Sequence, residues 1–253
     1  MGKYKLNAIN RFLEIGGLLK DHNKFSMDFL KRPLNEIQMD WANIMDGRKN
    51  FIILSPPGHT KSSTLTIRGT IEEICKNRNI RILIISNTVR QAQAFLREVS
   101  GNLESNENLI NMFGRFKPDN KDIVKWTDTE IQVRRNSFDK TPTVTAIGTL
   151  SSVEGIRVDR IFFDDILDID NTRTPESRQK VRDWFFTVIL PRLDKGGWAV
   201  GVGHRWNEDD LYGELMKMWE NRLYKAIQDD GSALMPEILP LEELLRRRNE
   251  SPI

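Results

Sequence analysis

Residues 51–63 carry the residue types of a phosphate-binding loop. Their sequence, FIILSPPGHTKSS, is an apolar run, then a loop with two prolines and a glycine, then Lys61 and Ser62. Phosphate-binding loops aim backbone N–H groups into a concavity, reach the outer phosphates with a lysine and bind Mg²⁺ with a hydroxyl. The usual pattern, G-x-x-x-x-G-K-[ST], has glycines where this chain has Ser55 and Thr60. The alternative is a strand-to-helix turn with Thr60 or Ser62 as the helix cap.

Asp164 and Asp165 end a second apolar run, in the segment RIFFDDILD. In nucleotide hydrolases, one such carboxylate holds Mg²⁺ and the next polarises the attacking water. Ligands of α/β folds bind at the carboxyl edge of the sheet, where these two side chains would lie. The two segments together predict a nucleotide-hydrolysing site. The alternative is that the pair caps a turn, and Asp168 and Asp170 are rivals of Asp165 for the water-polarising role.

The elements that would position these residues alternate between two kinds. Short apolar runs typical of buried strands cover residues 50–55, 80–86, 143–148, 159–165 and 197–203. Stretches with helical periodicity lie between most of them, so we expect a mainly parallel sheet covered by helices on both faces. The polar sequence of residues 113–145 predicts a hairpin insertion with a turn at 127–129. We place an N-terminal helical segment at 1–48, a core domain at 49–228 and a linker at 229–253.

The amino-acid composition restricts the possible functions only slightly. The 253 residues carry a formal net charge of +2, so bulk electrostatics do not indicate nucleic-acid binding. Basic clusters at residues 134–135 and 246–248 could contact DNA phosphates, although solvated charge is the commoner explanation. The lone Cys75 excludes an internal disulfide and fits a reducing compartment. No His or Cys cluster has the spacing of a zinc site.

Four segments together resemble the ATPase domain of the large terminase subunit, the motor that packs DNA into tailed-phage capsids. The loop SPPGHTKSS is similar to the family's PPRHGKS, with Gly58 in place of the arginine and Thr60 in place of the glycine. The segment GIRVDRIFFDDILD resembles the approach to the family's paired aspartates. The segment GHRWNEDDL resembles the family's TRWHEDDL motif, and MPEILPLEELLRRR resembles the exit towards its RNase H-like nuclease domain.

The resemblance implies an α/β fold of the RecA-like, additional-strand P-loop NTPase class: a mainly parallel central sheet flanked by helices, with an N-terminal helical lid. It implies ATP and Mg²⁺ as cofactors, with Ser62 and Asp164 organising the metal and Asp165 orienting water. It assigns nucleotide binding to ten residues: Gln38, Ser55, Pro56, Pro57, Gly58, His59, Thr60, Lys61, Ser62 and Ser63. Lys61 would also act in catalysis by holding the outer phosphates.

Three assignments from the resemblance have competing explanations. Gln38 would recognise adenine, or it is an exposed polar residue of a helix. His204 would sense the γ-phosphate, or it is a capping histidine, while Arg205 and Trp206 transmit its state or stack as a cation–π pair. Some relatives have a catalytic arginine where this chain has Glu154. Arg157 is the best substitute and would act on a neighbouring subunit, whereas Arg160 is expected to be structural.

The implied partners are double-stranded DNA, the portal protein, the small terminase subunit and further copies of the chain in a ring on the procapsid. The isolated domain could be a monomer, and the expected location is the host cytoplasm. A helicase or other DNA translocase is the alternative with the same fold. A nucleotide-binding scaffold that does not hydrolyse is the alternative of a different class, and the second carboxylate argues against it.

Overall fold

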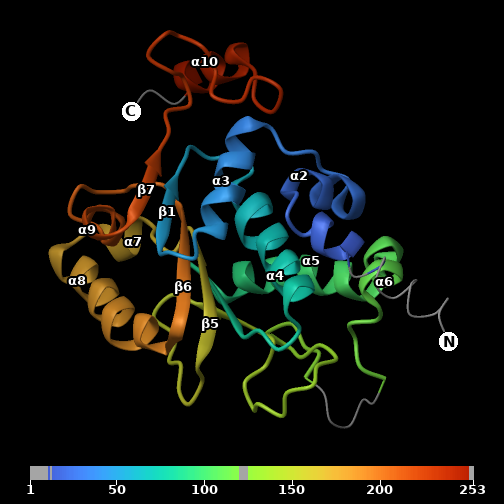
Figure 1. Ribbon diagram of the computed structural model, residues 1–253. Helices are drawn as coiled ribbons and strands as arrows, with labels where there is room; N and C mark the ends of the chain where they lie inside the picture. Colours follow the sequence, from blue (N-terminus) through green and yellow to red (C-terminus); the bar gives the residue numbers. More distant parts are fainter. Residues whose placement is uncertain (1–10, 12, 120–124, 251–253) are drawn as a thin grey trace, which may run out of the picture.

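A seven-stranded sheet forms the centre of the molecule in the computed structural model, which describes residue 11 and residues 13–119 and 125–250 (Figure 1). The strands follow the order β3-β4-β2-β5-β6-β1-β7, and every neighbouring pair is parallel except β3 and β4. The predicted mainly parallel sheet is therefore confirmed. The strands are β1(Phe51–Leu54), β2(Ile82–Ser86), β3(Glu130–Ile131), β4(Val144–Gly148), β5(Val158–Asp164), β6(Leu193–Gly203) and β7(Glu220–Leu223).

Helices cover both faces of this sheet. Residues 13–18 are helical. The named α-helices are α2(His22–Phe25), α3(Glu36–Asp46), α4(Gly69–Lys76), α5(Val89–Ser105), α6(Glu107–Phe113), α7(Ile169–Thr172), α8(Pro175–Trp184), α9(Leu211–Met218) and α10(Leu241–Glu250). Wider or tighter helical turns form η1(Ser26–Leu30), η2(Ser62–Arg68), η3(Phe185–Ile189) and η4(Leu190–Arg192). Because η2 runs directly into α4, residues 61–76 form one continuous helical segment.

Two hydrophobic clusters fill the space between the sheet and its helices. Side chains alternate between the faces of a strand, so Ile53 and Phe162 join one cluster while Ile52 and Phe163 join the other. The first cluster lies under α3, η2, α4 and α5, and the second under α8, η3 and α9. Figure 1 shows these two groups of helices on opposite sides of β5 and β6.

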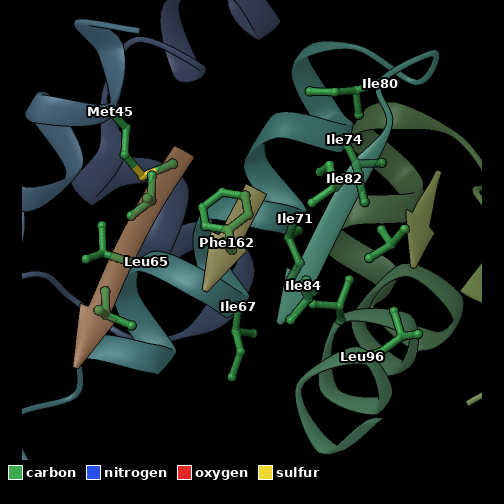
Figure 2. Packing of buried hydrophobic residues seen from close by; sticks show 14 of the residues in the cluster. Met45, Leu65, Ile67, Ile71, Ile74, Ile80, Ile82, Ile84, Leu96 and Phe162 are labelled. Carbon is green, nitrogen blue, oxygen red and sulfur yellow. The ribbon is translucent and has the colours of Figure 1, made fainter. Parts of the chain in front are cut away.

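The first cluster fixes the helix that follows the phosphate-loop segment. Figure 2 shows Leu65, Ile67 and Ile71 of this helix packed among Phe162 of β5 and Ile84 of β2. All five side chains are at most 4% exposed. Burying an aliphatic or aromatic side chain of this size stabilises a fold by about 1.5–3 kcal/mol, so the start of this helix has a well-determined position against the sheet.

Strand β6 lies between β1 and β5, with parallel pairing to both. The strand that enters the loop and the strand that ends at Asp164 are therefore separated by one strand. Strand β7, which the sequence pattern does not predict, pairs with the other side of β1. Its sequence, ENRL, is polar and half-exposed, because it lies at the edge of the sheet and needs no apolar alternation.

The N-terminal and C-terminal segments both pack onto the core domain. Phe25 and Trp41 of the N-terminal segment are 0% exposed, and they belong to the first cluster. Met235, in the segment expected to be a linker, is 1% exposed and belongs to the same cluster. The roles of these segments as a lid and a linker stay predictions.

The predicted polar insertion is present in reduced form. Residues 127–130 form a turn in which Thr127 N–H donates to Glu130 O at 2.8 Å, so the predicted turn is confirmed. Strand β3 has only two residues and pairs with β4, while Trp126 makes an isolated bridge to Ile131. Residues 120–124, which belong to the predicted hairpin insertion, lie outside the described residues. In the described part of the chain, no helix combines the length and apolar character needed to cross a membrane.

Candidate nucleotide-binding site

The loop between β1 and η2 turns sharply at two residues with positive φ. Gly58 has φ +84° and Thr60 has φ +57°. A β-branched residue in the left-handed region is strained, whereas glycine adopts it freely. Thr60 occupies the position of the pattern's second glycine, so this backbone conformation explains why that pattern has glycine. In this chain the Thr60 side chain gains a hydrogen bond in return, because Gln38 Nε2 donates to Thr60 Oγ1 at 2.6 Å.

Lys61 lies at the base of this loop with its side chain only 5% exposed. Its Nζ donates to Ser55 O at 2.6 Å and to Pro56 O at 3.3 Å. Burial lowers the pKa of Lys61, and the attraction of Asp165 and Asp164 opposes that shift. The structure therefore brings the amine into the electrostatic range of both carboxylates.

Asp164 is fully buried at the carboxyl end of β5 and accepts two hydrogen bonds from the helix after the loop. Ser62 Oγ donates to Asp164 Oδ1 at 2.9 Å, and Thr66 Oγ1 donates to Asp164 Oδ2 at 2.6 Å. Burial raises the pKa of Asp164 to about 7, although these two hydroxyls and Lys61 lower it. Sequence reasoning missed Thr66. Its spacing of four residues from Ser62 places both hydroxyls on one helix face.

Asp165 leaves the line of β5 through a backbone with φ +44°. Its N–H donates to Val202 O at 2.9 Å on β6, and its carboxylate Oδ1 lies 3.0 Å from His204 Nδ1. Aspartate tolerates the left-handed region better than most residues. The turn brings this second carboxylate to His204, which follows β6 directly.

Tyr212 of α9 stabilises this turn by hydrogen bonds. Its hydroxyl donates to Val202 O at 3.0 Å, and Ile166 N–H donates to the same hydroxyl at 3.4 Å. A β-carbon on Gly203 would lie only 2.6 Å from the Tyr212 hydroxyl, so a glycine is needed at that position. Sequence reasoning missed Tyr212, since nothing in its local pattern marks it.

Hydrogen bonds fix the conformation of the loop after His204. Asp210 is fully buried and accepts from the backbone N–H groups of Trp206, Asn207 and Gly213, which caps α9. The Trp206 ring lies against His204 with ring centroids 5.0 Å apart, and its Nε1 donates to Leu167 O. Arg205 instead donates to the carbonyls of Asn207 and Glu208. The proposed Arg205–Trp206 stack is therefore replaced by a His204–Trp206 contact.

A cavity of about 420 Å³ adjoins the loop on the side of the N-terminal segment. Its lining includes Leu30, Leu34, Gln38, Thr60 and Ile238. Gln38 is only 6% exposed, so the explanation as an exposed helical residue is wrong. Its Oε1 accepts from Asn35 N–H at 2.9 Å to cap α3. Recognition of adenine by Gln38 stays a prediction.

His59 and Ser55 complete the loop with polar atoms that are buried. His59 is 0% exposed, and its Nδ1 lies 3.2 Å from the carbonyls of Pro56 and Pro57. Within the described residues, His59 Nε2 and Ser55 Oγ have no hydrogen-bond partner. Buried polar atoms normally have a partner, so these two atoms are exceptions in the interior of the loop. Pro57 and Gly58 are exposed at the tip, and Ser63 is half-buried.

Arg157 does not join this group of residues. It precedes β5, and its Nη1 donates to Pro191 O at 2.7 Å, at the edge of the sheet opposite Asp164. Asp168 caps α7, and Asp170 is exposed. Arg160 pairs with Glu73 Oε2 at 2.7 Å and lies over the Trp198 ring, a structural role as expected.

Comparison with known proteins gives a likeness of fold. No family model matches the chain, and no curated protein matches it. Ten solved chains match. One of them is the crystal structure of the HK97 bacteriophage large terminase, with a TM-score of 0.54 and 15% sequence identity. The match covers 78% of this chain and 40% of the terminase chain, so the chain spans less than half of that protein. The chain therefore has a terminase-like α/β fold.

Proposed function

We propose that this chain is the Mg²⁺-dependent ATPase part of a large terminase subunit, which drives double-stranded viral DNA into a procapsid. The observation that carries the proposal is the contact between Ser62 and Asp164. A hydroxyl at the start of the loop helix and a carboxylate at the end of β5, 102 positions apart, meet at 2.9 Å. Lys61 is coupled electrostatically to the same carboxylate.

The residues present fit a bound Mg²⁺. Ser62 Oγ and Asp164 Oδ1 offer two neighbouring oxygen atoms, the ligand type that this ion prefers. Because burial raises the pKa of Asp164 to about 7, a divalent cation would favour its ionised form. When bound, Mg²⁺ supplies the positive charge that offsets the outer phosphates of the nucleotide.

Individual side chains would then have separate roles in hydrolysis. Lys61 Nζ would exchange the carbonyls of Ser55 and Pro56 for phosphate oxygens. Asp165 would accept a hydrogen bond from the attacking water and orient it. His204 would hold the Asp165 carboxylate in that orientation through the 3.0 Å contact. Precise positioning of this kind accounts for much of the catalysis of phosphoryl transfer.

The cavity beside the loop would bind the parts of the nucleotide other than its phosphates. Its volume of about 420 Å³ is in the range of small-molecule pockets. Gln38 would present its amide to the base after releasing Thr60 or Asn35. The remaining loop residues, from Ser55 to Ser63, would surround the phosphates, and all of them except Pro56 and Pro57 have a backbone N–H group to offer.

The strand order supports the assignment to the additional-strand class. Strand β6 separates β1 from β5, and His204 follows it directly, between the two halves of the site. The likeness to a bacteriophage large terminase supports the packaging role. We therefore also propose double-stranded DNA, a portal protein, a small terminase subunit and further copies in a ring as partners, in the host cytoplasm.

The direct test is ATP hydrolysis by the 253-residue chain, with Mg²⁺ and with EDTA, for the wild type, Asp165→Ala and Asp170→Ala. We expect Mg²⁺-dependent hydrolysis that only Asp165→Ala abolishes. Equal rates for wild type and Asp165→Ala would show that the site is assigned wrongly. A wild type that binds nucleotide but hydrolyses none at any protein concentration would favour the scaffold. Stimulation by double-stranded DNA distinguishes a packaging motor from an ATPase that does not contact DNA.

A further inference from the structure

Helix α10 reaches the tip of the candidate phosphate-binding loop. A β-carbon built on Gly58 would lie 3.8 Å from Arg247 Nη1 and 3.8 Å from Leu239 Cδ2. Gly58 itself is exposed. A guanidinium from the far end of the chain thus lies against the turn of the loop, separated from it in sequence by 189 positions (247 minus 58). Figure 1 shows α10 beyond the end of β7.

Buried contacts hold the segment that carries Arg247. Leu239 is 8% exposed, and Leu244 of α10 is 7% exposed. Met235, at 1%, belongs to the main cluster. Asn35 Nδ2 also donates to Glu237 Oε1, across to the N-terminal segment. Residues three apart on a helix lie near one face, so the exposed Arg247 projects from the same side of α10 as the buried Leu244.

The side chain of Arg247 is oriented by its own helix. Its Nε donates to Glu243 Oε1 at 2.7 Å, which fixes one edge of the planar guanidinium. Within the described residues, no hydrogen bond is recorded for Nη1 or Nη2, and the side chain is 52% exposed. Both terminal nitrogens of the guanidinium therefore remain available as donors beside the loop. Planar pairs of this kind suit phosphate oxygens.

The other arginines considered for the site are engaged elsewhere. Arg157 lies at the opposite edge of the sheet, and Arg205 donates to carbonyls of its own loop. Phosphoryl transfer gains from positive charge on the transferred group, and an arginine often supplies it. We infer that Arg247 contacts the outer phosphates of the nucleotide and supplies this charge from within the same chain. The inference rests on the function proposed above and replaces Arg157 in that role.

The first test is steady-state ATP hydrolysis and binding of a fluorescent ATP analogue by wild type, Arg247→Ala, Arg247→Lys and Arg246→Ala. Arg246 is the matched control, because it is the adjacent arginine and also pairs with Glu243. We expect Arg247→Ala to lower kcat roughly 10- to 1,000-fold, Arg247→Lys to keep part of the rate, and Arg246→Ala to stay within about twofold of wild type. Thermal melting checks that the variants fold.

The second test separates a same-chain arginine from one donated by a neighbour. Mixing Arg247→Ala with Asp165→Ala should restore no activity, since each site would still lack one of its own residues. An arginine at the loop tip in Gly58→Arg/Arg247→Ala should restore part of the rate, despite the positive φ of Gly58.

Three results would overturn the inference. The first is an Arg247→Ala rate equal to wild type or to Arg246→Ala, while Asp165→Ala is inactive, which leaves the proposed function intact. The second is restored activity on mixing, which assigns Arg247 to a neighbouring subunit's site. The third is a wild type that neither binds nor hydrolyses ATP, which removes the proposed function as well.

Discussion

His204 Nδ1 lies 3.0 Å from Asp165 Oδ1, and both side chains are about one-third exposed. His204 follows β6 and Asp165 follows β5, so the contact joins the ends of two neighbouring parallel strands. The backbone bond from Asp165 N–H to Val202 O ties the same two ends together. One carboxylate of the candidate site is thus held by the strand inserted between the two halves of that site.

His204→Ala should lower kcat for ATP hydrolysis about 10- to 100-fold and leave KM nearly unchanged. The reason is that His204 is proposed to orient Asp165 rather than to bind substrate. The measurement is steady-state kinetics of the single variants and of His204→Ala/Asp165→Asn. The double variant should be no slower than Asp165→Asn alone, because residues that act as a unit are not additive. Additive losses would show that His204 acts independently of Asp165.

Asp165→Asn should abolish hydrolysis and leave thermal stability unchanged or slightly higher. The amide keeps an oxygen for the contact with His204, and asparagine accepts the backbone φ of +44° readily. Asp165→Ala is the comparison, because it loses the contact and tolerates positive φ less well, at a cost of about 1–2 kcal/mol. Melting curves and ATPase rates of both variants check this. An active Asp165→Asn enzyme would exclude this carboxylate from the water-orienting role.

Asp164→Asn should stabilise the protein in the absence of Mg²⁺ and nucleotide, in a pH-dependent way. Burial raises the pKa of Asp164 from 3.8 to about 7, so ionisation costs the folded state stability as the pH rises between these values. The advantage of the variant should grow from about pH 4 to pH 7 and stay constant above, on the order of 4 kcal/mol at about 1.4 kcal/mol per pKa unit. Urea unfolding at several pH values measures it.

Asp170→Asn, at an exposed position, is the control for that series. Its stability relative to the wild type should not change with pH between about 4 and 7. Mg²⁺-dependent hydrolysis by Asp164→Asn should also be lost. A stability difference that does not vary with pH would mean that Asp164 is ionised throughout this range.

Glu72→Gln should destabilise the fold by about 3–5 kcal/mol. Glu72 is 1% exposed, pairs with Arg68, and lies 2.8 Å from His22 Nδ1. Burial opposes its ionisation, but Arg68 and the nearby His22 ring lower its pKa to about 2. The variant would leave the buried Arg68 without its partner. Urea unfolding at pH 7 measures the loss.

The stability that the Glu72 carboxylate contributes is present above its unfolded pKa of 4.5 and is lost as the pH falls towards 2. The difference between wild type and Glu72→Gln should therefore shrink over that interval. Glu250→Gln, in an exposed pair with Arg246, is the control and should cost less than about 1 kcal/mol. Equal losses for the two variants would contradict the special cost of the buried pair.

The two main strands of the site were predictable from sequence because each contains an apolar run, residues 51–54 in β1 and residues 161–163 in β5, that stops at polar residues. Burial on both faces of a parallel sheet produces that pattern in β1 and β5. Strand β7 escaped prediction because an edge strand carries no such signal. The meeting of Ser62 with Asp164 followed from the rule that parallel strands present their carboxyl ends at one edge.

Other parts of the site depend on how distant segments fold back, which local patterns do not encode. Gln38 is buried because α3 packs beside the loop, whereas its sequence context suits an exposed helix equally well. Arg157 seemed near the site by sequence spacing, but β5 carries the chain from one edge of the sheet to the other after that residue. The approach of Arg247 to Gly58 requires the whole C-terminal segment to be placed first.

The helix that begins at Lys61 has a mechanical consequence. Its first turn holds the loop and Asp164, while its last turns hold Glu72 and Lys76, which lie within ion-pair distance of His22 and Asp46. One continuous helix thus joins the phosphate end of the sheet to the N-terminal helices. A helix resists compression along its axis. A small shift of the loop along that axis would therefore displace the N-terminal helices by a similar amount.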